Sequence, residues 1–99
     1  MTNKQEVEKF LINKYGVGVF KYKGFKYLRD IIADNDDYIT GSIIQEYVIV
    51  AAEYNESYPS VERAIRYFQE MLDPKHRQPN AVFINNLIFE FKKHKENEV

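Results

Sequence analysis

The sequence contains no cysteine and only two histidines among its 99 residues. The absence of cysteine excludes a disulfide framework and any metal site built on thiolates, and it fits a reducing compartment. Neither histidine, His76 or His94, is spaced with a carboxylate or a second histidine in a way that suits a metal ion or a general base. We therefore expect a protein that is not an enzyme and that needs no metal and no cofactor.

Long apolar runs are also missing. No stretch of about 18 apolar residues could cross a bilayer, and residues 1–6 lead into no apolar core of a signal peptide. The acidic run 34–37 resembles the beginning of a calcium loop, but the glycine and glutamate that such a loop needs do not follow it, so we interpret it as a solvated turn. These absences predict a cytoplasmic protein with no membrane contact and no small-molecule substrate.

The residues that are present indicate one soluble globular domain over residues 1–99. Hydrophobic residues make up 44% and charged residues 29%, and seven Phe and eight Tyr supply large side chains for a small core. Base stacking is an alternative role for the aromatic rings. Core packing is favoured because five phenylalanines lie on helical apolar stripes: Phe10, Phe25, Phe68, Phe83 and Phe91.

Charge is unevenly distributed along the chain. The net charge is −1, but residues 1–29 carry +5, residues 30–62 carry −8 without a single Lys or Arg, and residues 63–99 carry +2. A net charge near zero argues against strong nonspecific binding to nucleic acid, which depends on neutralising phosphates. Two basic zones around an acidic one are equally typical of a protein-binding surface.

The apolar spacing predicts an all-α fold of about five helices. The expected helices cover 7–15, 25–32, 43–54, 58–72 and a segment that begins at Pro79-Asn80. Residues 17–22 admit a short strand as an alternative. Residues 47–50 are rich in β-branched side chains, but the helical stripe continues well beyond them, which favours a helix.

A helix-turn-helix is expected at about residues 43–72. Asn55 suits the left-handed position that ends a helix, Ser57 can cap the next helix, and Pro59 suits its first turn. That second helix should end near Asp73-Pro74, because proline cannot continue it. In a helix-turn-helix of this kind, the polar side of the second helix faces a DNA major groove.

The segment Val61-Glu62-Arg63-Ala64-Ile65-Arg66 carries the functional hypothesis. An inward stripe of Val61, Ala64, Ile65, Phe68 and Leu72 would leave Glu62, Arg63 and Arg66 on the outer face. Two guanidinium groups there could bind guanine edges or phosphates. The alternative is an ordinary solvated face with a Glu62–Arg66 ion pair four residues apart.

Several motifs follow one another in the order of a known family. They are Lys23-Gly24-Phe25-Lys26-Tyr27-Leu28-Arg29-Asp30, Gly41-Ser42-Ile43, then Tyr47, Ala51, Tyr54 and Asn55, the hexapeptide 61–66 unchanged, and Pro79-Asn80 with Phe83-Ile84. Over nearly the whole chain, this order resembles the C-terminal DNA-binding effector domain of the sporulation response regulator, stage zero sporulation protein A.

The resemblance implies a sequence-specific, DNA-binding transcription regulator of sporulation that reads the major groove of double-stranded DNA with helix 58–72. Glu62, Arg63 and Arg66 would contact base edges, and Ser57 and Ser60 would contact phosphates, although capping alone accounts for Ser57. Because one such helix covers few base pairs, we expect a homodimer on DNA.

The sequence also departs from the family pattern. Ser60 stands where the family has an arginine, Pro59 replaces a small residue, and the connection from Leu72 to Pro79 is shorter than in the family. We expect a stand-alone domain without a receiver, which represses by occupying DNA. The alternative function is a protein-interaction module that keeps the fold but antagonises or pairs with a full-length sporulation regulator.

Overall fold

The computed structural model describes residues 3–35 and 37–97, and these form five α-helices and one 3₁₀ helix. The α-helices are α1 (Asn3–Tyr15), α2 (Lys23–Ala33), α3 (Ile43–Tyr54), α4 (Tyr58–Leu72) and α5 (Asn80–Asn97), and the 3₁₀ helix η1 covers Val17–Lys21. No strand occurs among the described residues. The all-α prediction is therefore confirmed. Of the acidic run 34–37, Asp36 lies outside the described residues.

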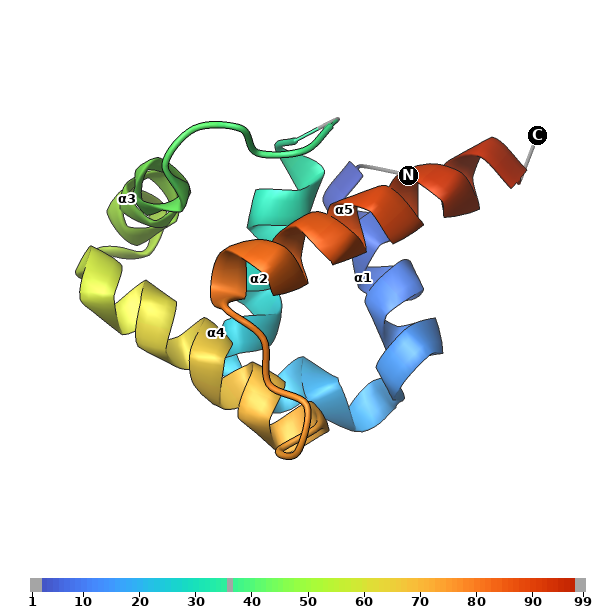
Figure 1. Cartoon of the computed structure of the whole chain (residues 1–99), viewed down its shortest axis with the longest axis horizontal. Coiled ribbons are helices and arrows are strands. Elements are labelled where there is room, and N and C mark those ends of the chain that lie inside the picture. Colours follow the sequence, from blue (N-terminus) through green and yellow to red (C-terminus); the bar gives the residue numbers. More distant parts are fainter. Residues whose placement is uncertain (1–2, 36, 98–99) are drawn as a thin grey trace.

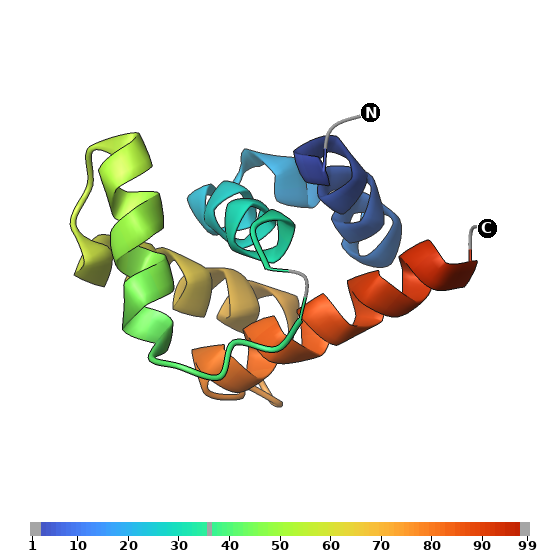
Figure 2. The ribbon, with the colours of Figure 1, turned by 90° about the horizontal axis from the view of Figure 1, so that it is seen from above.

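Helix α2 is the centre of the molecule. It lies between α1 and α3 in two perpendicular views (Figure 1, Figure 2), and it packs against every other helix. Eight of its eleven residues are buried, including Phe25, Leu28 and Ile31. The predicted core phenylalanines lie in the same interior: Phe10, Phe25, Phe68 and Phe91 are buried, and Phe83 packs against the core partly buried.

The turn between α3 and α4 has the expected caps. Asn55 takes the left-handed conformation with φ 56°, and Ser57 accepts a hydrogen bond from the amide of Ser60 at 3.3 Å. Helix α4 ends at Leu72, directly before Asp73-Pro74. The three residues 55–57 thus join two helices that pack against each other.

The strand alternative for residues 17–22 is wrong. Gly16, with φ 94°, turns the chain, and the amides of Val19 and Tyr22 then donate to the carbonyls of Gly16 and Val19, three residues back. Only Val19 of this segment is buried. The bonds within the segment therefore replace the pairing that a strand would need. The strand alternative for residues 47–50 is wrong as well, because these residues lie within α3.

Helices α2 and α4 are in close contact at Gly24. A Cβ atom at this position would lie 2.5 Å from the carbonyl oxygen of Ala64 and 2.6 Å from Cβ of Phe68. No residue with a side chain fits here without moving a helix. Gly24 therefore fixes where α4 sits on α2, and with it the direction in which the outer face of α4 points.

A buried polar network joins α3 to α2. The carboxylate of Asp30 has no exposed surface and accepts hydrogen bonds from Arg29 Nε at 2.8 Å and from the Tyr54 hydroxyl at 2.6 Å. Arg29 also bonds Glu8 of α1 and donates to the Tyr54 hydroxyl at 2.9 Å. Burial and Asp30 together raise the pKa of Tyr54 to about 12. Burial opposes the charge of Arg29, but its bonds to Asp30 and Glu8 outweigh this and raise its pKa.

No helix in the described part of the chain is long and apolar enough to cross a membrane. Residues 3–35 and 37–97 also contain no group of three or more His, Asp or Glu side chains arranged to hold a metal ion.

Candidate nucleic-acid interface

The inner side of α4 is the apolar stripe predicted from the sequence. Val61, Ile65 and Phe68 are buried, and Ala64 and Leu72 are partly buried against the same core. This burial anchors the helix on α2 and turns the opposite side to solvent. The outer side carries Glu62, Arg63 and Arg66, which are partly or fully exposed.

Arg63 occupies the middle of this outer side. Its side chain is exposed, and none of the described residues holds it in a hydrogen bond or an ion pair. It lines a shallow depression between α2 and α4 together with Lys23, Glu56 and Tyr67. The guanidinium therefore keeps its full set of donors for a partner outside the molecule.

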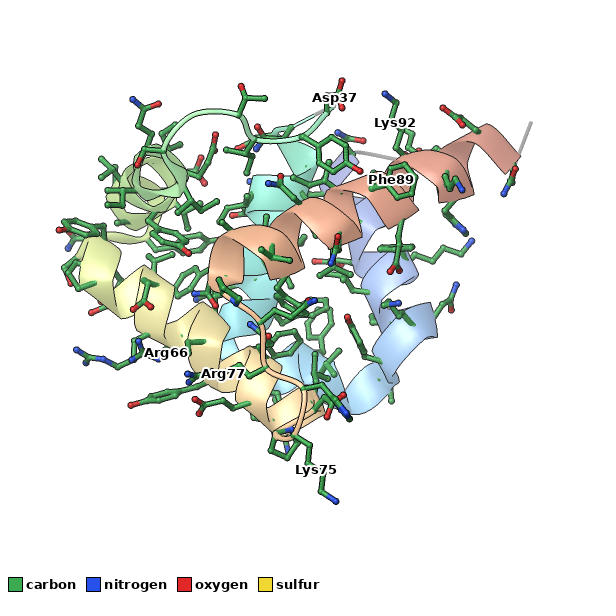
Figure 3. The ribbon with its side chains drawn as sticks, in the orientation of Figure 1. Asp37, Arg66, Lys75, Arg77, Phe89 and Lys92 are labelled. Carbon is green, nitrogen blue, oxygen red and sulfur yellow. The ribbon has the colours of Figure 1, made fainter. Side chains whose placement is uncertain are left out.

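Glu62 and Arg66 form the ion pair that the alternative interpretation predicts. Arg66 Nη1 lies 3.0 Å from Glu62 Oε1, and the side chains are 38% and 35% exposed, respectively. The guanidinium also lies 5.9 Å from the ring centroid of Tyr67. A surface pair of this kind contributes about 0.3–0.5 kcal/mol, so a stronger partner can displace it. Figure 3 shows Arg66 pointing away from the body of the molecule.

Ser57 and Ser60 lie together at the beginning of α4. Besides the capping bond, their hydroxyl oxygens are 3.0 Å apart. Ser57 is exposed and Ser60 is partly exposed. The capping role of Ser57 is thus present in the structure, and both hydroxyls remain near the positive end of the helix dipole, where an anion is favoured.

Further cations lie near α4 that were not predicted from the sequence as site residues. Lys23 comes from the beginning of α2 and lies beside Arg63. Lys75 and Arg77 come from the connection between α4 and α5, and Arg77 forms an ion pair with Glu70 on the outer side of α4. Only the tertiary fold brings these residues to α4. The single local signal was the cluster of basic residues in segment 75–77.

The outer side of α3 has a different character. Ile44, Val48 and Ile49 are each about half exposed, although they are large apolar residues. No Lys or Arg occurs anywhere between residues 30 and 62. The positive charge around α4 therefore comes from its own arginines, from α2 and from the connection 73–79. The basic end of α5 does not join it, because Lys92 lies on the opposite side of the molecule (Figure 3).

Comparison with known proteins identifies a family but does not address individual residues of the site. No curated protein and no solved structure matches the chain significantly. A family model does match: that of the sporulation initiation factor Spo0A, C terminal, covers residues 8–98. The chain therefore belongs to the family of the C-terminal domain of sporulation initiation factor Spo0A, which is a family of DNA-binding effector domains.

Proposed function

We propose that this chain is a sequence-specific transcriptional regulator whose helix-turn-helix, residues 43–72, inserts α4 into the major groove of its operator. The observation that carries the proposal is Arg63, an exposed arginine without a partner among the described residues, at the outermost position of a helix that is firmly anchored on its other side. An arginine in this position can form two parallel hydrogen bonds to a guanine.

The neighbouring side chains have complementary roles in this proposal. Arg66 exchanges Glu62 for a second guanine, and the released carboxylate of Glu62 accepts from a cytosine amino group. Ser57 and Ser60 contact a phosphate at the edge of the groove. The Glu62–Arg66 pair supports these roles, because it holds both side chains at the surface, where they are partly exposed and accessible to DNA.

The small size of the reading surface argues for a homodimer on DNA. Each bidentate contact contributes about 1–3 kcal/mol of discrimination, and one helix makes few of them. Two copies on half-sites about one DNA turn apart would supply the rest. A chain that binds in this way represses by occupying the site, and the seven-residue connection 73–79, with no helix of its own, offers little additional surface for contacting a polymerase.

The test begins with selection of the preferred duplex from a randomised pool, followed by measurement of its affinity and that of a random duplex. Arg63→Ala and Arg66→Ala should each weaken binding to the selected duplex by about 5- to 150-fold, the equivalent of 1–3 kcal/mol, with a much smaller loss on the random duplex. Lys92→Gln, on the opposite side of the molecule, is the matched control. Equal losses on both duplexes would exclude a base-reading role.

The exposed apolar side of α3 favours a second candidate function. A protein-interaction module that pairs with a full-length sporulation regulator would use Ile44, Val48 and Ile49, which DNA would not bind. This function predicts no shift of the selected or random duplex at micromolar protein. It also predicts a complex with the full-length regulator in size-exclusion chromatography, which Val48→Lys abolishes.

A further inference from the structure

We propose that the connection 73–79 is a second DNA contact, in which Lys75 and Arg77 bind phosphates beside the groove that α4 enters. This inference rests on the proposed function. It adds a backbone-binding element that follows from the fold and not from the hexapeptide 61–66.

A tight turn places Lys75 at the tip of the connection. The amide of His76 donates to the carbonyl of Asp73 at 3.3 Å, and the His76 ring nitrogen Nδ1 lies 3.0 Å from the Asp73 carboxylate. Pro74 occupies the second position of this turn, where its fixed φ is favourable. Lys75 therefore takes the third position, exposed and without a partner among the described residues. In Figure 3 it points away from the molecule.

A buried glutamine fixes the rest of the connection against α4. The side chain of Gln69, which is 4% exposed, accepts a hydrogen bond from the amide of Gln78 and donates to Asn80 at 3.4 Å. Asn80 in turn donates to the carbonyl of Glu62 at 3.1 Å. Both ends of the segment 78–80 are thus tied to α4. The residues just before this segment therefore lie along the flank of α4.

Arg77 reaches from this flank to the outer side of α4. Its Nη1 bonds Oε1 of Glu70, with both side chains at least 40% exposed. Glu70 lies one turn beyond Arg66, and the last turn of α4 contains no basic residue. Without Arg77, the second half of α4 would therefore present an unpaired carboxylate to the phosphates. With it, the same region presents a guanidinium that keeps further donors.

The connection and the hexapeptide would then have separate tasks. Arg63 and Arg66 distinguish bases, whereas Lys75 and Arg77 neutralise phosphates, which carry no sequence information. In Figure 3, Arg66, Arg77 and Lys75 lie on one side of the molecule and follow one another along α4 and its end. Phosphates on the strand next to the occupied groove are the ligand chemistry that fits this row.

The experiment measures affinity for the selected and random duplexes over a range of salt concentrations. Lys75→Gln should lower the affinity for both duplexes by the same factor and reduce the slope of log K against log salt by about 0.9. For Arg77, the comparison is between Glu70→Gln and Glu70→Gln/Arg77→Gln, because the ion pair is absent from both. Relative to Glu70→Gln, the double variant should again show a slope of log K against log salt that is smaller by about 0.9. Lys92→Gln, the control, should keep the wild-type slope.

The possible outcomes separate this inference from the proposed function. Unchanged salt slopes in both tests would overturn the second contact, even if Arg63→Ala abolishes discrimination. If only the Arg77 comparison shows no change, Arg77 merely neutralises Glu70, and the part of the inference that gives it a phosphate is overturned. If Arg63→Ala leaves discrimination intact while the two slopes fall, the base-reading proposal fails and the phosphate contact stands. Circular dichroism of each variant confirms that the helices are retained.

Discussion

Helices α3 and α4 lie three residues apart in the chain but differ on both of their sides. On the outer side, α4 carries Arg63 and Arg66, whereas α3 carries apolar residues and no cation. On the inner side, α4 rests on α2 through a glycine contact and phenylalanine packing, whereas α3 is tied by the hydrogen bonds of Tyr54 to Asp30 and Arg29. Tyr47, Val50 and Ala51 of α3 are buried in the core as well, so packing is common to both helices. The difference teaches that a close backbone approach sets the position of α4, whereas a buried polar network holds α3 in addition to its packing.

Removing the central carboxylate should have the largest effect on this comparison. Asp30→Ala leaves Arg29 without its principal partner and Tyr54 without its acceptor. Breaking a buried pair in this way should lower the free energy of unfolding by about 3 kcal/mol. Urea denaturation measures the change. Glu90→Ala, which removes an exposed partner of Lys14, should cost less than about 1 kcal/mol. Equal losses would mean that the network does not anchor α3.

Filling the close contact between α2 and α4 should have the second-largest effect on stability. In Gly24→Ala, the added methyl group meets the Ala64 carbonyl and Phe68, so the free energy of unfolding should fall by about 1–3 kcal/mol. Because α4 must move, affinity for the selected duplex should fall as well. The control is Gly18→Ala, where no atom lies within 4 Å of the new Cβ. A Gly24→Ala protein with wild-type stability would contradict the role given to this contact.

Measuring the free energy of unfolding as a function of pH tests the polar network that ties α3 to α2. The pKa of Tyr54 is raised from 10.0 to about 12, so the folded state holds this proton more tightly than the unfolded chain. The resulting stabilisation is complete below pH 10 and is lost as the pH rises towards 12. The difference in the free energy of unfolding between the wild type and Tyr54→Phe should therefore become smaller as the pH rises from 10 towards 12. A constant difference would indicate that the hydroxyl is not bonded to Asp30.

The outer side of α3 gives the smallest expected change in stability. Val48→Lys replaces an exposed side chain, so the free energy of unfolding should stay within about 0.5 kcal/mol of the wild type. If α3 crosses the DNA backbone while α4 reads the groove, the new cation should raise affinity for both duplexes and steepen the salt dependence. Val17→Lys, on η1, is the matched exposed control. Equal gains in affinity from Val48→Lys and Val17→Lys would show that the affinity depends on the net charge of the protein and not on the position of the new cation.

Local sequence signals were sufficient for the helices and the turn. The positions of Asn55, Ser57 and Pro74 depend on backbone preferences of single residues, and the stripe of α4 depends on spacing alone, so both could be predicted. The segment 17–21 could not, because valines next to glycines suit a strand as well as a 3₁₀ turn. In that case the conformation of Gly16 decided between hydrogen-bond patterns that the composition allows equally.

The environment of the candidate site was harder to predict, because it depends on contacts between distant residues. The ion pair of Glu62 with Arg66 follows from their spacing. The approach of Lys23 to Arg63 and the bond from Gln78 to Gln69 do not, because each requires that two elements first pack together. The roles of Ser57, Ser60, Glu62, Arg63 and Arg66 towards DNA remain predictions, and affinity measurements on Arg63→Ala and Arg66→Ala test the two arginines.

The glutamine under the connection also has an evolutionary consequence. Because Gln69 is bonded to both Gln78 and Asn80, we expect that the residues between Asp73 and Gln78 can vary in number and charge without disturbing α4. On the proposed function, the affinity for DNA and the preferred DNA sequence can then diverge independently among related chains. Grafting this connection onto a relative should transfer the strength of binding while the preferred sequence stays with the recipient.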